Sequence, residues 1–482
     1  MSRPVRRLAA VLVVLLVALL INLNVIQVWF ADDYRSRSGN TRLVLEEYDR
    51  ERGPILVATT PVARSIKTSD QLTYLRVYSA GPQYAPATGF YSLIYGATGI
   101  ERQENAVLSG TDDRFAVDRL QQLFAGRTPR GGGVELPLDA AAQAAAWEGL
   151  AGRTGAVVAI QPTTGAILAL ASSPSFDPNL LSSHDPDSIR EAYAAYIADP
   201  RKPLLNRPLV QTLPPGSTFK LVTAAAALTS GRFTPDTVIP GPATYKLPGS
   251  TKELSNWQGR ECGPDGKVTL REALAISCNT AFAWLGNQLG NEALATQSAL
   301  FGFDTSFAVP MTAATSRYPG DADPAQTAQS AIGQFDVRAT ALQMAMVGAA
   351  IGNNGVTMNP YLVKSILSPD LSVLETATPS PFKVAMTPEH AAQEVSMMVT
   401  VVEDGTGSNA QIPGVRVGGK TGTAQTGTSA KPHAWFVALA PAEAPTVAVA
   451  VVLENGGGAA EVSGNRLAAP IARAVIEAVL GR

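Results

Sequence analysis

The chain has 482 residues, of which 46% are apolar and 16% charged, and its formal net charge is −2. This length and apolar content suffice for two or three domains with a large core. The near-neutral charge, without a long basic run, argues against binding to nucleic acid. The 2 cysteines and 3 histidines show no metal-ligand spacing, so we expect no metal and no other cofactor.

Residues 8–30 form an apolar segment of the length that spans a bilayer. Arg3, Arg6 and Arg7 precede it, and such positive flanks stay in the cytoplasm. A cleaved signal peptide is the alternative, but no small-x-small cleavage site follows, and Trp29 suits the interfacial end of an anchor. We therefore expect a single-pass protein of the cell membrane, with a cytoplasmic N-terminus and the rest of the chain on the extracytoplasmic side.

We expect three parts: a cytoplasmic tip with a transmembrane anchor at 1–31, an N-terminal pedestal domain with a linker at 32–150, and a larger C-terminal domain at 151–482. After the anchor, short alternating apolar stretches broken by Gly, Pro and Asp indicate β-rich structure up to about Gly126. The following "GRTPRGGGVELPLD", with successive glycines at 131–133, is typical of a linker.

The C-terminal part is predicted to be an α+β domain. "GAVVAI" from Gly155 and the following "AILALAS" indicate two buried strands joined in a hairpin. Near the C-terminus, "RVGGKTGTAQ", "HAWFVALA" and "TVAVAVVLE" indicate three more strands, and "NRLAAPIARAVIEAVL" an amphipathic helix. A largely helical segment lies between them. This order favours one five-stranded antiparallel sheet flanked by helices.

The stretch "LPPGSTFKL" places Ser217 at the start of a helix. Two prolines and Gly216 end any preceding element, and the run from Leu221 consists of good helix formers. Residues three apart share one helix face, roughly 5–6 Å apart at their Cβ atoms. The Lys220 amine can therefore reach the Ser217 hydroxyl, which would pair a nucleophile with a base.

The same Ser-x-x-Lys spacing recurs in "SPFK" at Ser380 and Lys383, so the motif alone is weak evidence. Pro388 would end any helix within two turns of this copy. We expect it to form a polar loop or a short surface turn.

Two further motifs follow in order. "REALAISCNTAFAWLG" places Ser277 and Asn279 in a polar interruption of an apolar helical stretch. "VGGKTGTAQ" places Lys420 and the following residues Thr421, Gly422 and Thr423 on a strand. Ser-x-x-Lys, then Ser-x-Asn, then Lys-Thr-Gly is a signature shared by penicillin-binding proteins and class A β-lactamases.

With these motifs, the chain resembles a class B penicillin-binding protein, a peptidoglycan D,D-transpeptidase, of the short actinobacterial type. The likeness covers nearly the whole exported part and includes "ERGPIL", "TTGAILALASSPSFDPN", "NRPLVQTLPPGSTFK", "AIGQFDVRATALQMA" and "EDGTGSNA". One departure concerns the pedestal. After Arg-Gly-Pro-Ile the family commonly has Asp-Arg-x-Gly, whereas here Leu56 begins "LVAT".

Chemistry suits each residue to a role. Ser217 needs a base, and the helix N-terminus and the second cation Lys420 would both lower the pKa of Lys220. Ser277 can relay a proton to the leaving amine, and Asn279 can bind both Lys220 and the donor peptide. The Lys-Thr-Gly-Thr run suits a terminal carboxylate, with Gly422 allowing the substrate backbone to lie close. The resemblance adds an oxyanion hole made by the backbone N–H groups of Ser217 and Thr423.

Cys262 and Cys278 both lie in the exported part. An oxidising compartment permits a disulfide across this loop, which would contribute roughly 3 kcal/mol. Two free buried thiols are the alternative, and the sequence does not choose between them.

Other functions share this site. A β-lactamase would leave the pedestal unexplained. A D,D-carboxypeptidase carries the same motifs, and a β-lactam sensor would acylate once and signal, but carries several spans. We expect a transpeptidase that acts on D-Ala-D-Ala stem peptides and is acylated and inhibited by β-lactam antibiotics. The resemblance implies a SEDS-family glycosyltransferase as partner.

Overall fold

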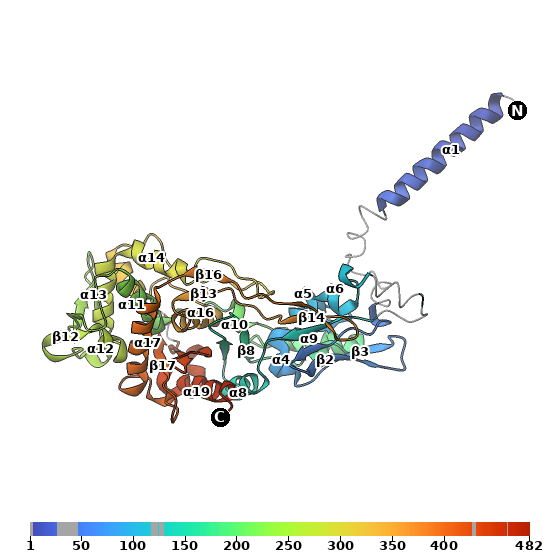
Figure 1. Cartoon of the computed structure of the whole chain (residues 1–482). Helices are drawn as coiled ribbons and strands as arrows, with labels where there is room; N and C mark the ends of the chain where they lie inside the picture. Colours follow the sequence, from blue (N-terminus) through green and yellow to red (C-terminus); the bar gives the residue numbers. More distant parts are fainter. Residues whose placement is uncertain (1–2, 27–46, 117–123, 125–129, 427–429, 460) are drawn as a thin grey trace.

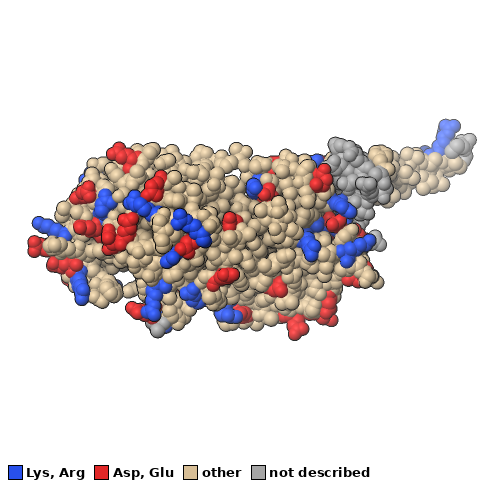
Figure 2. All heavy atoms as spheres, turned by 60° about the horizontal axis from the view of Figure 1, so that its bottom comes forward, with Lys and Arg blue, Asp and Glu red and all other residues tan. Residues whose placement is uncertain are grey.

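The computed structural model describes residues 3–482 apart from 27–46, 117–123, 125–129, 427–429 and 460. Figure 1 shows an elongated body with α1 (Arg3–Asn24) outside it. In this view β2, β3, β14, α5 and α6 lie toward the α1 end of the body, and α12, α13 and α14 lie at the opposite end. The acidic and basic side chains of the face shown in Figure 2 are interspersed, as expected for a nearly neutral chain.

The N-terminal helix α1 spans 22 residues and begins at Arg3, five residues before the apolar run. At 1.5 Å per residue it is about 33 Å long, enough to cross a bilayer. Within the described residues it is the one helix both long and apolar enough to do so. Trp29, which we expected at its interfacial end, lies outside the described residues.

The pedestal contains a six-stranded sheet in the order β15-β14-β6-β1-β2-β3. Strands β1 and β6 are parallel, and the other neighbours are antiparallel. The strands are β1 (Ile55–Val57), β2 (Thr60–Lys67), β3 (Tyr74–Tyr78), β6 (Gly133–Leu136), β14 (Ser365–Leu367) and β15 (Val373–Thr376). The hairpin β14–β15 belongs to the catalytic half of the chain, yet it pairs with β6, for example Ser365 opposite Glu135.

The pedestal is less purely β-rich than its sequence pattern indicated. In its described residues, α-helices and a two-stranded sheet lie beside the six-stranded sheet. These elements are α4 (Gly81–Thr88), α5 (Gly99–Gln103), α6 (Asn105–Ser109), β4 (Tyr91–Ser92) and β5 (Gly96–Ala97). Their helices are short, and a helix of one or two turns leaves little periodicity to recognise.

The Arg-Gly pair of the pedestal has a structural role. Arg52 and Arg76 each place Nε 2.6 Å from the Glu101 carboxylate, which is fully buried. A Cβ at Gly53 would lie 1.7 Å from the Gly132 carbonyl oxygen, so only glycine fits there. The departure "LVAT" forms the end of β1 and the turn into β2, with Ala58 at φ 53°.

The glycines at 131–133 do not form an open linker. A Cβ at Gly131 would lie 1.8 Å from the Leu108 carbonyl oxygen, and one at Gly132 would lie 2.4 Å from the Phe115 ring. Gly133 begins β6 of the pedestal sheet. These residues therefore belong to the packed pedestal, and their lack of side chains allows close backbone contact.

The catalytic half is built on a five-stranded antiparallel sheet in the order β17-β18-β19-β7-β8, which confirms the predicted sheet. Its strands are β7 (Gly155–Ile160), β8 (Ile167–Ser173), β17 (Gly418–Ala424), β18 (His433–Ala440) and β19 (Val447–Leu453). Alternate residues enter two cores, so that Val158 faces one and Val157 the other. Burial on both faces explains why these strands are continuous apolar runs.

Helices cover both faces of this sheet. On one face pack α8 (Ala140–Leu150) and α19 (Ala469–Val479), and on the other α11 (Lys220–Thr229) and α16 (Ala341–Gly352). The remaining helices of this half are α9 (Pro186–Ala198), α10 (Arg207–Val210), α12 (Leu270–Ala275), α13 (Asn279–Leu289), α14 (Asn291–Leu300), α15 (Pro324–Ser330), α17 (Pro388–Glu403) and α18 (Gly464–Leu467). The smaller strands are β9 (Val238–Pro240), β10 (Thr244–Lys246), β11 (Glu253–Ser255), β12 (Lys267–Thr269), β13 (Val356–Met358) and β16 (Pro381–Val384).

Glu394 on α17 is fully buried, and neither carboxylate oxygen has a hydrogen-bond partner among the described residues. Burial raises the pKa of this carboxyl well above its usual range. An unfolded glutamate ionises near pH 4.3, at a lower pH than the folded one. The folded state therefore binds more protons between the two pKa values, and this group lowers the free energy of unfolding as pH rises through that window.

We expect Glu394→Met to raise the free energy of unfolding at about pH 8 by roughly 2 kcal/mol, because an apolar side chain of similar length replaces an unpaired buried acid. Thermal melting of the variant and the wild type at about pH 5 and pH 8 measures this, with the larger difference at the higher pH. The exposed Glu403→Met on the same helix is the control. An equal shift at both pH values would contradict the expectation.

Candidate active site

Ser217 lies in the 3-10 turn Gly216–Phe219, immediately before α11, as the sequence predicted. Gly216 adopts φ 54°, and a Cβ there would meet Ala424 of β17 at 2.9 Å. The fully buried Trp435 donates its indole N–H to the Pro214 carbonyl at 3.0 Å. The serine turn is thus fastened to the edge of the sheet, with Ser217 half-buried at the helix N-terminus.

Lys220 is fully buried, and its Nζ contacts the Ser-x-Asn motif. It lies 2.7 Å from the Ser277 carbonyl oxygen, 2.8 Å from Asn279 Oδ1 and 3.3 Å from Ser277 Oγ. In the described part of the chain, no hydrogen bond joins Lys220 to Ser217. The predicted partner is close in sequence, but the buried amine is held by the motif that follows it.

Ser277 and Asn279 lie where α12 ends and α13 begins, which agrees with the predicted interruption. Ser277 adopts φ 60°, a conformation that costs a non-glycine residue free energy and is found at functional sites. This turn directs both its carbonyl and its hydroxyl to amines. Lys420 Nζ lies 2.9 Å from Ser277 Oγ and 2.9 Å from the Thr421 carbonyl oxygen.

The buried amines of Lys220 and Lys420 therefore both lie within hydrogen-bond distance of the Ser277 hydroxyl. Burial and the nearby Lys420 hold the pKa of Lys220 well below its usual range. Burial lowers the pKa of Lys420 to about 7. No carboxylate among the described residues forms an ion pair with either amine, so nothing offsets the repulsion between two charges. The favoured state has Lys220 neutral and Lys420 protonated.

The Lys-Thr-Gly-Thr run lies on β17 at the edge of the sheet. Thr421 is 8% exposed and its Oγ1 lies 2.8 Å from Thr406 Oγ1, whereas Thr423 is exposed. A Cβ at Gly422 would lie 3.0 Å from the Pro215 carbonyl oxygen, so the turn that bears Ser217 approaches this glycine closely.

Sequence reasoning assigned no role to Thr406 or Asn256. Thr406 Oγ1 bridges Thr421 to the Ala275 carbonyl at the end of α12. The side chain of Asn256 is hydrogen-bonded to the start of α13. The stretch "EDGTGSNA" was the one sequence signal for Thr406, through the family resemblance. Nothing in the sequence around Asn256 marked it.

The structure joins Cys262 and Cys278 in a disulfide, one of the two states that the sequence left open. The bond ties the residue between Ser277 and Asn279 to the loop that follows Asn256. The described residues contain no cluster of His, Cys, Asp and Glu able to hold a metal ion.

The second Ser-x-x-Lys copy does not form such a site. Ser380 lies just before β16, and Lys383 lies on that strand, which pairs with β13; the loop or turn that we expected is therefore a strand from Pro381 onward. Ser380 Oγ accepts a hydrogen bond from Asn359, and Lys383 Nζ donates to the Ala299 carbonyl at 3.3 Å. His433 begins β18, and its ring nitrogen accepts the Asn455 backbone N–H.

The chain matches two protein families. Residues 155–477 match the family described as "Penicillin binding protein transpeptidase domain". Residues 52–134 match the family described as "Penicillin binding protein A dimerisation domain".

Among curated proteins, the chain is 45% identical to the peptidoglycan D,D-transpeptidase PbpA of Mycolicibacterium smegmatis, over 100% of this chain and 99% of that protein. It is 43% identical to the protein of the same name from Mycobacterium tuberculosis, with the same coverage. Among solved structures, penicillin-binding protein A from M. tuberculosis as an imipenem acyl-enzyme complex superposes with a TM-score of 0.87, at 44% identity, covering 90% of this chain and 100% of the other. Its penicillin G acyl-enzyme complex superposes with a TM-score of 0.86, at 44% identity, covering 89% and 100%.

Proposed function

Since this chain belongs to the class B penicillin-binding proteins and is a serine-type peptidoglycan D,D-transpeptidase, we propose that Ser217 is its nucleophile and that it cross-links stem peptides. The observation that carries this proposal is the array of Lys220, Ser277 and Lys420. Their contacts of 3.3 and 2.9 Å place two amines of unequal pKa on either side of one hydroxyl, beside the helix N-terminus that bears Ser217.

Acylation begins when Ser217 Oγ attacks the carbonyl carbon of the penultimate D-alanine. Neutral Lys220 takes the hydroxyl proton, because burial and the nearby Lys420 hold its pKa well below that of an ordinary lysine and so favour the unprotonated amine. The backbone N–H groups of Ser217 and Thr423 stabilise the oxyanion. The C–N bond then breaks, and D-alanine leaves after receiving a proton through Ser277.

Substrate binding uses the edge strand. Protonated Lys420, with the hydroxyls of Thr421 and Thr423, binds the terminal carboxylate of D-Ala-D-Ala. Asn279 Oδ1 accepts a hydrogen bond from Lys220. The Nδ2 group of Asn279 donates to the Ser255 carbonyl at 3.3 Å, and its second N–H is left to bind the donor peptide. The amine of a second stem peptide then attacks the ester carbon, forms the cross-link and releases Ser217.

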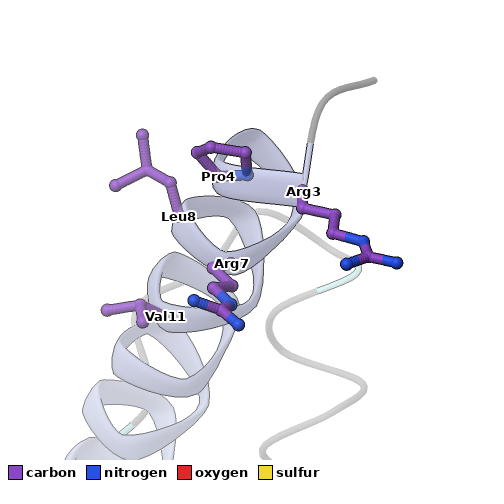
Figure 3. Close-up of a pocket in the computed structure, with 5 residues that line it drawn as sticks. All are labelled: Arg3, Pro4, Arg7, Leu8 and Val11. Atoms are coloured by element: carbon purple, nitrogen blue, oxygen red, sulfur yellow. The ribbon is translucent and has the colours of Figure 1, made fainter.

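The anchor supports a membrane location. Arg3 and Arg7 lie on the first turns of α1, with Pro4, Leu8 and Val11 beside them (Figure 3). We propose a cytoplasmic N-terminus and an extracytoplasmic catalytic domain, because basic residues precede the apolar run. We also propose a SEDS-family glycosyltransferase as partner, which the family membership implies.

Product analysis separates transpeptidation from carboxypeptidation. The protein is incubated with a D-Ala-D-Ala donor pentapeptide, with and without a second stem peptide as acceptor, and the products are quantified by mass spectrometry. We expect the cross-linked dimer to exceed the hydrolysed tetrapeptide when the acceptor is present, because the ester carbon must then meet an amine before water. Enzyme treated beforehand with benzylpenicillin is the control. Hydrolysis that exceeds cross-linking at every acceptor concentration would support a D,D-carboxypeptidase instead.

A further inference from the structure

Asn256 makes an unusually complete set of side-chain hydrogen bonds for a loop residue. It is 8% exposed and follows β11 directly. Its Oδ1 accepts the backbone N–H groups of Asn279 and Thr280, at 2.9 and 3.0 Å. Its Nδ2 lies 2.9 Å from the carbonyl oxygens of Pro242 and Arg260. One amide therefore joins three separate chain segments.

This amide completes the N-cap of α13. The first N–H groups of a helix have no partner within the helix and normally bond to an oxygen of the preceding residue. Here that residue is Cys278, whose sulfur is a weak acceptor and lies 3.4 Å from the Ala281 N–H. Asn256 Oδ1 takes the two N–H groups before it, from 23 and 24 residues away.

The capped helix start is also the turn that carries Ser277 and Asn279. Ser277 has φ 60°, which persists only where the surroundings over-determine the backbone. Asn256 fastens the turn on its C-terminal side, and the Cys262–Cys278 disulfide ties the middle residue to the same loop. Without these fastenings, the backbone is free to relax toward an unstrained conformation.

We propose that Asn256 is a positioning residue for acyl transfer, an inference that rests on the proposed function. It holds the strained turn so that Ser277 Oγ stays between the Lys220 and Lys420 amines, and so that Asn279 Oδ1 stays 2.8 Å from Lys220 Nζ. Asn256 acts through these residues, and its own polar atoms are all occupied within the protein.

The test separates acylation rate from the amount of folded enzyme. The full-length protein in detergent is reacted with a fluorescent penicillin in stopped flow, which gives the rate constant of acylation and the amplitude of the adduct. For Asn256→Ala we expect an acylation rate constant about tenfold to a hundredfold lower, at unchanged amplitude per folded molecule, because a displacement of about 1 Å at a catalytic group costs up to about a hundredfold.

Two variants make the result specific. Asn256→Asp keeps an acceptor for the two helix N–H groups, where negative charge is favourable, and should recover part of the rate. Asn206→Ala removes a side chain that donates to the Pro86 carbonyl at 2.7 Å, away from the motifs, and should leave the rate constant unchanged. If Asn256→Ala does not fold, the Asp variant decides: a rate reduced by about twofold to tenfold at full amplitude supports the proposal.

A wild-type rate constant in both Asn256 variants, with loss of amplitude or melting temperature alone, would show that Asn256 only stabilises the fold and would overturn the inference. The wild-type protein distinguishes failure of the proposed function from failure of the role assigned to Asn256. If it forms no adduct in the same assay, the proposed function fails. If it does and the variants match it, this inference alone fails.

Discussion

Replacing Ser217 with alanine is expected to abolish the covalent adduct with benzylpenicillin. The hydroxyl at the start of α11 is the proposed nucleophile, and alanine cannot form the ester. Intact mass spectrometry of the protein after incubation measures this directly, since the wild type should gain the mass of one penicillin. Ser217 is half-buried, and its turn is held by the hydrogen bond from Trp435 to the Pro214 carbonyl, so the fold and the melting temperature should change little.

The second Ser-x-x-Lys copy provides a matched control. Ser380→Ala removes a serine at the same spacing from a lysine, just before β16, and should leave the adduct intact. An adduct that survives in Ser217→Ala would rule out this nucleophile. A wild-type adduct that is hydrolysed within seconds would instead indicate a β-lactamase or a carboxypeptidase.

Substituting Lys220 should reduce the rate of acylation by roughly 10² to 10⁴, the usual contribution of a general base. Lys220→Met preserves the length of the buried side chain but cannot accept a proton. Lys220→Arg keeps a charge that is never lost near neutral pH. Both variants should be defective in a stopped-flow acylation assay, whereas Lys383→Met should match the wild type. A fast Lys220→Arg variant would contradict a base role for this lysine.

The same assay, repeated across a range of pH, tests the protonation states of Lys220 and Lys420 that acylation requires. Acylation requires neutral Lys220, so the rate should fall toward acid pH as that amine becomes protonated. Binding of the carboxylate requires charged Lys420, whose pKa is about 7. The ratio of acylation rate to binding constant should therefore also fall as pH rises above that value, which gives a bell-shaped profile. In Lys220→Met the acid limb should disappear.

The strands of the catalytic sheet could be predicted because their sequences are continuous apolar runs of strand length, and the sheet buries both of their faces. The β14–β15 hairpin could not be assigned to the pedestal sheet, because its pairing with β6 joins residues more than 200 positions apart and local pattern carries no trace of it. For the same reason, the glycines at 131–133 resembled a linker, whereas backbone contacts such as that of Gly131 with Leu108 explain them.

The site was predictable as a set of motifs but not as a geometry. Lys220, Ser277, Asn279 and Lys420 come together as expected, and Ser217 lies at the start of the helix that bears Lys220. The hydrogen bond between Asn279 and Lys220 was expected and is present, whereas helical spacing suggested a bond between Lys220 and Ser217 and did not reveal that the Ser277 carbonyl accepts from the amine. Asn256 escaped notice because its role depends on a contact between segments rather than on a motif.

The β14–β15 hairpin has a consequence for exchanging parts between relatives. The pedestal is not one continuous piece of chain, since its sheet takes two strands from residues 365–376, deep within the catalytic half. A chimera that replaces only the N-terminal segment would bring in a foreign β6, which would have to pair with the β14–β15 hairpin of the original chain. A transferable pedestal therefore consists of two pieces of sequence, and recombination has to carry both.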